Sequence, residues 1–320
     1  MAYPQMAAFA RLANGDVAPV RSIAGQPTMI SRAGHNVEYD PINDEMWHAN
    51  PEAQAILVFR GGANGEEAPI RVIQGPHTLL AFPNYGVGVD AVHNEVFVVE
   101  KEYISVYPRT ANGDVAPIRV IRGPDTGLAN ARAIIVDPVR NVLIVGTNNG
   151  LVILDRTANG NAKPRAIIAG PMSGIRASKP PHSGPLTRDE IEARRRGNTG
   201  AAIQSMRMSP KGYIVTLVGG RGRGGDDDED SAGAAEDAGE DRGGGGGRAG
   251  RGPGGGPAGI AAWNIDDFLK VSGHGDVPPV YVLSDPKGVV GPGRVALNPN
   301  QKEVILGGNR IVMYSFPEIF

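Results

Sequence analysis

The sequence predicts an all-β fold, a β-propeller of about five four-stranded blades with six as the alternative, from three observations. An Asn-Gly pair recurs every 47 to 50 residues, a period typical of propeller blades or helical solenoids. Short runs rich in β-branched residues flank each pair, and helical periodicity is absent. The recurring pairs are Asn14-Gly15, Asn64-Gly65, Asn112-Gly113 and Asn159-Gly160.

Each Asn-Gly pair is expected to form a tight hairpin turn, because Asn and Gly enter left-handed backbone conformations at low cost. A proline opens the strand after the turn, which suits an outer edge strand. Two more strands precede each hairpin, so the unit has four antiparallel strands, A to D from the channel outward. The first three strands of each full repeat are expected at 36–41, 44–50 and 55–61, at 85–90, 94–100 and 103–110, and at 133–138, 141–146 and 150–157.

Two degenerate repeats follow. Residues 206–220 supply strands A and B of the fourth blade, 258–265 supply C and 276–286 supply D. Residues 294–316 give A, B and C of the last blade, and no D strand follows. The N-terminal run 18–25 reads as a lone D strand, so we expect it to pair with the C-terminal blade and close the ring. Residues 4–12 resemble an extra C strand, which keeps the six-bladed alternative open.

The pattern from Gly86 to Tyr107, Gly-Val-Gly-Val-Asp followed by Glu-Val-Phe-Val and Ile-Ser-Val-Tyr, resembles the NHL-repeat family. More loosely it is similar to gluconolactonase-like propellers. The resemblance implies a propeller over nearly the whole chain. It also implies a choice between binding scaffolds and enzymes such as lactonases or lyases. In the gluconolactonase-like enzymes, Glu, Asn and Asp side chains hold a divalent metal in the central channel.

Composition narrows the function classes. The chain of 320 residues has a net charge of −2 and no cysteine. We therefore expect one domain over 1–320, a monomer, with neither nucleic acid nor membrane as partner. No disulfide or thiolate metal site can form. The first fifteen residues lack the pattern of a signal peptide, so the compartment stays unknown, with export expected if a signal has been removed.

Alternation along the A strands predicts the channel lining. Apolar residues such as Val37 and Tyr39 are expected to pack between blades, and the residues between them to face the channel. The predicted channel residues with binding roles are Asn36, Glu38, Ser205, Arg207 and Arg294. One residue further back, at the channel mouth, come His35, Tyr85, Arg132 and Gln204.

Three interpretations of the channel remain open. Glu38 pairs with Arg207 or Arg294 simply to neutralise the lining, or the two arginines form a carboxylate or anion site with Glu38 orienting them. The third is a metal on Glu38 and Asn36, whose two oxygen ligands are few for a divalent cation.

Two insertions are predicted on the face that carries the D-to-A and B-to-C connections. The first, 171–200, contains a capping box from Thr187 to Glu190 that should begin a short helix. The second, 219–259, is rich in Gly, Asp and Arg and is expected to be disordered.

The sequence favours a non-catalytic binding or scaffold module. It would engage a protein, a glycan or a small anionic ligand through the insertion-bearing face, with no cofactor. No catalytic residue is identified, because the sequence holds no nucleophile elbow, phosphate loop or zinc spacing. The alternative is a channel-centred enzyme, a metal-assisted lactonase or related hydrolase or a lyase, and only this alternative implies a divalent cation such as calcium.

Overall fold

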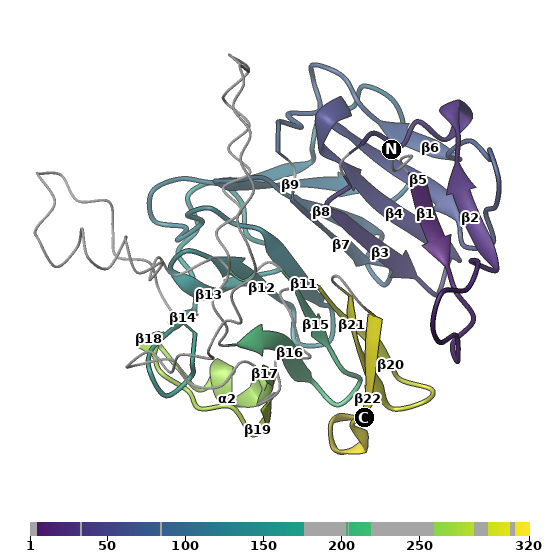
Figure 1. Ribbon diagram of the computed structural model, residues 1–320. Helices are drawn as coiled ribbons and strands as arrows, with labels where there is room; N and C mark the ends of the chain where they lie inside the picture. The colour runs from purple at the N-terminus through teal and green to yellow at the C-terminus, as the bar shows by residue number, and fades with distance from the viewer. Residues whose placement is uncertain are drawn as a thin grey trace, which may run out of the picture.

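The computed structural model describes residues 5–32, 34–83, 85–175, 203, 205–218, 259–284, 294–307 and 311–320. It confirms the predicted all-β propeller with five blades, whose sheets follow one another along the chain (Figure 1). Nearly all of both predicted insertions, including the helix expected from Thr187, lies outside the described residues. Among the helices of the described part, none is long and apolar enough to cross a membrane.

The first three blades have four antiparallel strands each. Blade 1 contains β3 (Asn36–Asp40), β4 (Glu45–Asn50), β5 (Ala55–Arg60) and β6 (Arg71–Ile73). Blade 2 contains β7 (Gly86–Asp90), β8 (Glu95–Val99), β9 (Tyr103–Pro108) and β10 (Arg119–Arg122). Blade 3 contains β11 (Ala133–Asp137), β12 (Val142–Thr147), β13 (Gly150–Asp155) and β14 (Ala166–Ile168), and β18 (Gly273–Gly275) adds to it in parallel.

The remaining sheets are less regular. Blade 4 contains β15 (Met206–Met208), β16 (Tyr213–Val218), β17 (Gly259–Asn264) and β19 (Tyr281–Ser284), with helix α2 (Ile265–Leu269) after β17. Blade 5 has three strands, β20 (Arg294–Asn298), β21 (Glu303–Gly307) and β22 (Ile311–Ser315). The N-terminal hairpin is a separate sheet of β1 (Gln5–Ala8) and β2 (Arg21–Ala24). Short 3-10 turns lie at Gln26–Thr28, Pro51–Ala53 and Pro317–Ile319.

The core lies between neighbouring blades, because each sheet is apolar on both faces. Val87 packs with Trp47 and Val58 of blade 1. On the opposite face of the same strand, a Cβ added to Gly88 would lie 2.8 Å from Val136 Cγ2 of blade 3. Alternation along an inner strand therefore directs side chains toward the two neighbouring blades. The prediction that every second residue faces the channel was wrong for such positions.

The two apolar residues of β3 also depart from the prediction. Val37 and Tyr39 were expected to pack between blades, but they are exposed, Tyr39 to 52%. The hairpin β1–β2 covers the outer half of this face of blade 1, where Leu57 and Phe59 are fully buried with Ile23. The inner half of the face has no such cover from the described residues.

The Asn-Gly pairs serve folding, as expected, but they do not form tight hairpin turns. The connection from β5 to β6 spans residues 61–70, which is too long for a two-residue turn. Asn112 Oδ1 instead accepts a hydrogen bond of 2.9 Å from the amide of Val72, in the outer strand of the preceding blade. Gly113, at φ 79°, binds the same strand through its own amide. Asn64 and Asn159 repeat the bond to Ser22 and Val120.

The predicted closure of the ring was wrong in its pairing. Strand β2 pairs with β1, with Ala7 opposite Ser22, and the C-terminal sheet has the order β20-β21-β22. The physical reason is the segment noted above as an extra C strand. It lies directly upstream of β2, so the two strands form a local hairpin, whereas pairing with β22 would join opposite ends of the chain.

Candidate functional site

Three of the predicted mouth residues come together in one stack. The His35 and Tyr85 rings are 5.1 Å apart and nearly parallel, at 7°. Arg132, which belongs to blade 3, has its guanidinium 4.7 Å from the centre of the Tyr85 ring. Each of the three residues directly precedes the inner strand of its blade. Each donates its backbone amide to a carbonyl of the second strand of the same blade, at Ala49, Val99 and Gly146 respectively. The fourth predicted mouth residue, Gln204, lies outside the described residues.

Arg207 connects blade 4 to blade 1. Its Nη2 lies 3.3 Å from Glu38 Oε2 and donates to the Val37 carbonyl at 3.2 Å and to Asn36 Oδ1 at 3.5 Å. Both charged side chains are about one quarter exposed. Burial raises the pKa of Glu38, while the nearby Arg207 lowers it. The structure thus brings together Asn36, Glu38 and Arg207.

Arg294 adds positive charge from blade 5. Burial lowers the pKa of its guanidinium, and the positive charges of Arg207 and Arg132 lower it further. The Arg294 guanidinium of blade 5 is therefore close enough to Arg132 of blade 3 and Arg207 of blade 4 to be repelled by both, and Glu38 pairs with Arg207. An anion entering between them would relieve this repulsion.

Ser205 has a structural contact. Its Oγ accepts a hydrogen bond of 2.9 Å from the Val295 amide, and its carbonyl accepts one of 2.7 Å from Thr216 Oγ1. The residue is buried. Ser205 therefore ties the inner strands of blades 4 and 5 together beside Arg207 and Arg294.

The two oxygen ligands predicted for a metal, on Glu38 and Asn36, share an arginine. Among the described residues, no group of three His, Cys, Asp or Glu side chains could hold a metal ion. The oxygens of Glu38 and Asn36 both lie within reach of the Arg207 guanidinium. A divalent cation at these oxygens would have to displace that arginine or share its ligands with it.

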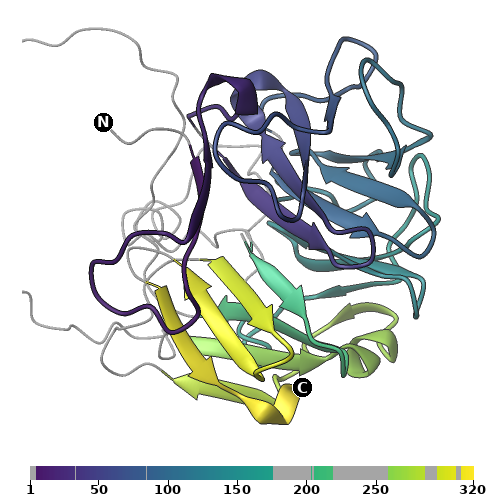
Figure 2. The same ribbon diagram turned by 90° about the vertical axis from the view of Figure 1, so that its right-hand side faces the viewer.

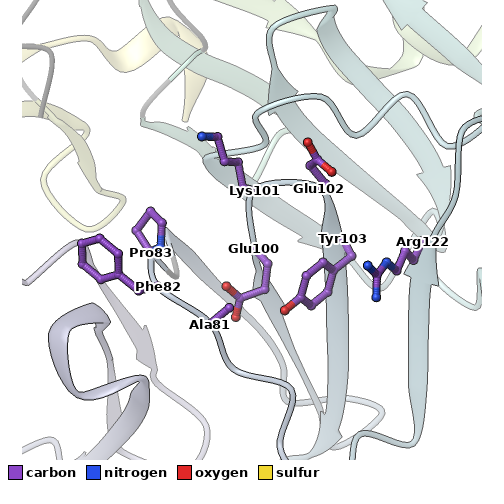
Figure 3. A pocket seen from close by; sticks show the side chains of 8 residues that line it. All are labelled: Ala81, Phe82, Pro83, Glu100, Lys101, Glu102, Tyr103 and Arg122. Atoms are coloured by element: carbon purple, nitrogen blue, oxygen red, sulfur yellow. The ribbon is translucent and has the colours of Figure 1, made fainter. Parts of the chain in front are cut away.

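A second feature, a pocket of about 150 Å³ around Glu100, was not predicted from the sequence (Figure 3). Glu100 is buried, and neither carboxylate oxygen reaches good hydrogen-bond geometry among the described groups. Burial raises its pKa to about 8, which the Ala81 backbone amide opposes. The pocket is lined by Ala81, Phe82, Pro83, Glu100, Lys101, Glu102, Tyr103 and Arg122.

The repeat explains why Glu100 is buried. It occupies the place that Asn50 has in blade 1, at the end of the second strand. There the Asn50 side chain accepts from the Ser31 amide and donates to the Met29 carbonyl, each at 2.9 Å. A protonated Glu100 has the same kinds of group, one acceptor and one donor. An alignment of the repeats that sets Glu100 against Asn50 could have identified Glu100 from the sequence.

Comparisons with known proteins support the fold and leave the family open. No family model matches the chain, and no curated protein matches it in sequence. The chain is similar in structure to the β-propeller domain of Myceliophteria thermophila Cps50 (Swd1), with a TM-score of 0.50 and 7% identity, over 90% of this chain and 68% of that one. A weaker likeness is to hydrazine synthase of Kuenenia stuttgartiensis, with a TM-score of 0.44 and 9% identity, over 84% of this chain and 54% of that one.

Proposed function

We propose that this propeller, of the type that NHL repeats form, is a non-catalytic binding module that holds an anionic group at its channel mouth. The observation that carries the proposal is that Arg207, held by Glu38 and Asn36, lies near Arg294, whose guanidinium pKa is lowered by burial and then by the positive charges of Arg207 and Arg132. One adjacent carboxylate, Glu38, offsets part of this charge. The ligand would be a small carboxylate or phosphate, or an acidic side chain of a protein.

The chemistry of guanidinium supports this choice of ligand. Two arginines can each donate a pair of parallel hydrogen bonds to a carboxylate or phosphate, a geometry that lysine cannot match. Arg132 is held in place by its contact with Tyr85, and Arg207 by Asn36 and Glu38. Side chains that are already ordered lose little entropy when a ligand binds.

Isothermal titration calorimetry with citrate as the probe tests the proposal. Arg207→Gln and Arg294→Gln should each weaken citrate binding by about ten-fold or more, because each removes charge-assisted hydrogen bonds. Arg165→Gln is the matched control, since Arg165 is an exposed arginine that pairs with Asp155, and it should leave the affinity unchanged. If the double variant with Arg207→Gln and Arg294→Gln binds citrate as tightly as the wild type, the proposal is contradicted.

A second measurement on the wild-type protein distinguishes a binding module from the metal-assisted enzyme. Equilibrium dialysis against calcium, followed by elemental analysis, measures whether a divalent ion is bound stoichiometrically. The proposal expects no such ion at the channel. A stoichiometric ion that is lost in Glu38→Gln would favour the enzyme instead.

A further inference from the structure

The connection that leads into each of the first three blades contains the same turn. In each turn a threonine hydroxyl donates to the carbonyl of the glycine three residues earlier. The threonines are Thr28, Thr78 and Thr126. The residue after each threonine has a positive φ, and these residues are Met29 at 58°, Leu79 at 58° and Gly127 at 73°. The carbonyls of these three residues therefore occupy equivalent places in their blades.

An asparagine amide donates to this carbonyl in blades 1 and 3. The pairs are Asn50 Nδ2 with the Met29 carbonyl at 2.9 Å, and Asn149 Nδ2 with the Gly127 carbonyl at 3.1 Å. In blade 2 the Leu79 carbonyl instead accepts a hydrogen bond of 2.7 Å from the Tyr103 hydroxyl. The second strand of that blade is followed by Glu100 and not by an amide side chain. Blade 2 therefore has a carboxyl group beside the turn, in place of the N–H donors of its neighbours.

The side-chain groups close to the Glu100 carboxyl are hydrogen-bond acceptors. Burial raises the pKa of Tyr103 and Tyr107, and the nearby charge of Glu100 raises the pKa of both further. Both hydroxyls donate to backbone carbonyls of the turn, so their oxygens have only lone pairs left to offer. Glu100 itself is 1% exposed. A buried carboxylate surrounded in this way favours a ligand that brings hydrogen-bond donors or positive charge.

The pocket beside Glu100 has room for a small ligand with an apolar stem. Its volume of about 150 Å³ matches a cavity that holds benzene, so about six non-hydrogen atoms fit inside it. Phe82, which is 60% exposed, and Pro83 lie on one side of Glu100, and the Tyr103 ring lies on the other (Figure 3). An alkyl chain can lie between these apolar groups, with a cation at its inner end facing Glu100 and the aromatic ring.

The other charged groups of the pocket leave the place beside Glu100 open. Figure 3 shows the Lys101 ammonium and the Glu102 carboxylate directed away from Glu100. The Arg122 guanidinium lies 5.3 Å from the centre of the Tyr103 ring, on the side away from Glu100. Among the described residues, none of these cations pairs with the Glu100 carboxylate. A carboxylate buried in a pocket without a partner is more typical of a functional site than of a structural position.

We propose that this pocket binds a primary ammonium group on an alkyl chain, with Glu100 as its counter-ion. The ammonium would donate to the Glu100 carboxylate and to the Tyr103 phenol oxygen, and its alkyl stem would contact Phe82. The ligand is a free alkylamine or the lysine side chain of another protein, which present the same chemistry. The pocket shares none of its described lining residues with the proposed anion site. In Figure 2 the blue sheet of blade 2 lies across the ring from the yellow sheet of blade 5, which carries Arg294.

Isothermal titration calorimetry at pH 9 with n-butylamine as the probe tests the proposal. The amine is protonated at this pH, as a lysine side chain is. Glu100→Gln should weaken binding by about ten-fold or more, because it removes a charge-assisted hydrogen bond. Glu52→Gln is the matched control, since Glu52 is an exposed carboxylate in the corresponding connection of blade 1, and it should leave the affinity unchanged. Absence of binding to the wild type, or equally tight binding to Glu100→Gln, would overturn the proposal.

The pH dependence of the affinity distinguishes an ion pair from filling of the pocket by an alkyl chain. Burial raises the pKa of Glu100 to about 8, so about one tenth of the carboxyl groups are ionised at pH 7 and about nine tenths at pH 9. The affinity for n-butylamine should therefore rise about ten-fold over this range in the wild type, and the rise should be absent in Glu100→Gln. A profile that is flat in the wild type would contradict the role of Glu100 as counter-ion.

Two further titrations identify the source of the ammonium group. Nα-acetyl-lysine N-methylamide carries a lysine side chain between two peptide groups. Tighter binding of this compound than of n-butylamine would assign the site to a lysine of a protein, and the reverse would assign it to a free amine. Tyr103→Leu should weaken the binding of either compound by about two- to five-fold, because it removes the aromatic ring and the phenol oxygen. Unchanged binding in this variant would contradict the proposed pose.

Discussion

Replacing Glu100 by glutamine is expected to stabilise the folded protein at pH 9 by as much as about 4 kcal/mol, the order of magnitude that a pKa shift of this size represents. The folded-state pKa of about 8 lies above the ordinary value of 4.5. Between these values the folded protein keeps a proton that the unfolded chain has released. The contribution of Glu100 to the free energy of unfolding therefore falls as pH rises from about 4.5 to about 8 and is constant above that.

Urea unfolding of the two proteins at pH 5, 7 and 9 measures this difference. The curves should nearly coincide at pH 5, where Glu100 is protonated in the folded state, and separate increasingly toward pH 9. Glu102→Gln is the control, because Glu102 lies two residues along the same connection and is exposed. Parallel pH profiles for the wild type and Glu100→Gln would show that Glu100 titrates normally.

The surroundings of Glu100 also explain why sequence reasoning missed it. An acidic residue at the end of a strand is normally solvated. Its burial here depends on the connection at 81–83, which comes from the preceding blade and lines the same pocket. No local pattern around residue 100 contains that information. Comparison with Asn50 at the equivalent repeat position does contain it, because Asn50 ends the second strand of blade 1 and Glu100 directly follows the second strand of blade 2.

The blades were predictable because their signals are local and repeated. The spacing of the Asn-Gly pairs and the apolar runs beside them located the strands of the first three blades, and similar apolar runs located those of blades 4 and 5. Ring closure was different, since two segments, β1 and β22, have the character of a C strand and one outer strand, β2, was available to both. The choice depends on contacts between distant residues such as Arg11 and Glu303. Local pattern alone could not make that choice.

Three of the residues predicted to line the channel are neighbours in the structure. Glu38, Asn36 and Arg207 were predicted as channel residues, and the structure brings them into contact. Whether they bind a ligand stays a prediction. By the same alternation Ile135 of β11 would face the channel, yet it packs in the core between blades 3 and 4. Both faces of the inner strands of blades 2 and 3 meet neighbouring blades, so the alternation of residues along a strand does not by itself identify those that line the channel.

The ion pairs between blades provide a second large effect. Glu95→Ala is expected to destabilise the protein by about 3 to 5 kcal/mol, because it removes the carboxylate that pairs with Arg119 in a largely buried site and leaves Arg156 with Asp90 alone. Arg119 donates to the two Glu95 oxygens at 2.6 and 2.9 Å, and Arg156 donates to Oε2 at 2.6 Å. The Arg156 side chain is 8% exposed. Hydrogen bonds from Arg119 lower the pKa of Glu95, opposed by burial, so stability from this contact is lost as pH falls below about 4.5.

Glu303→Ala is the matched control, since Glu303 occupies the same repeat position in blade 5. Its partner Arg11 is 42% exposed, and an exposed pair contributes about 1 kcal/mol or less. Urea unfolding at pH 7 should therefore show a several-fold larger loss for Glu95→Ala than for Glu303→Ala. A triple variant with Glu95→Met, Arg119→Met and Arg156→Met should recover much of the loss, because apolar packing can replace a buried charge cluster. Equal losses in the two single variants would contradict the prediction that burial of the charge cluster around Glu95 sets the size of the effect.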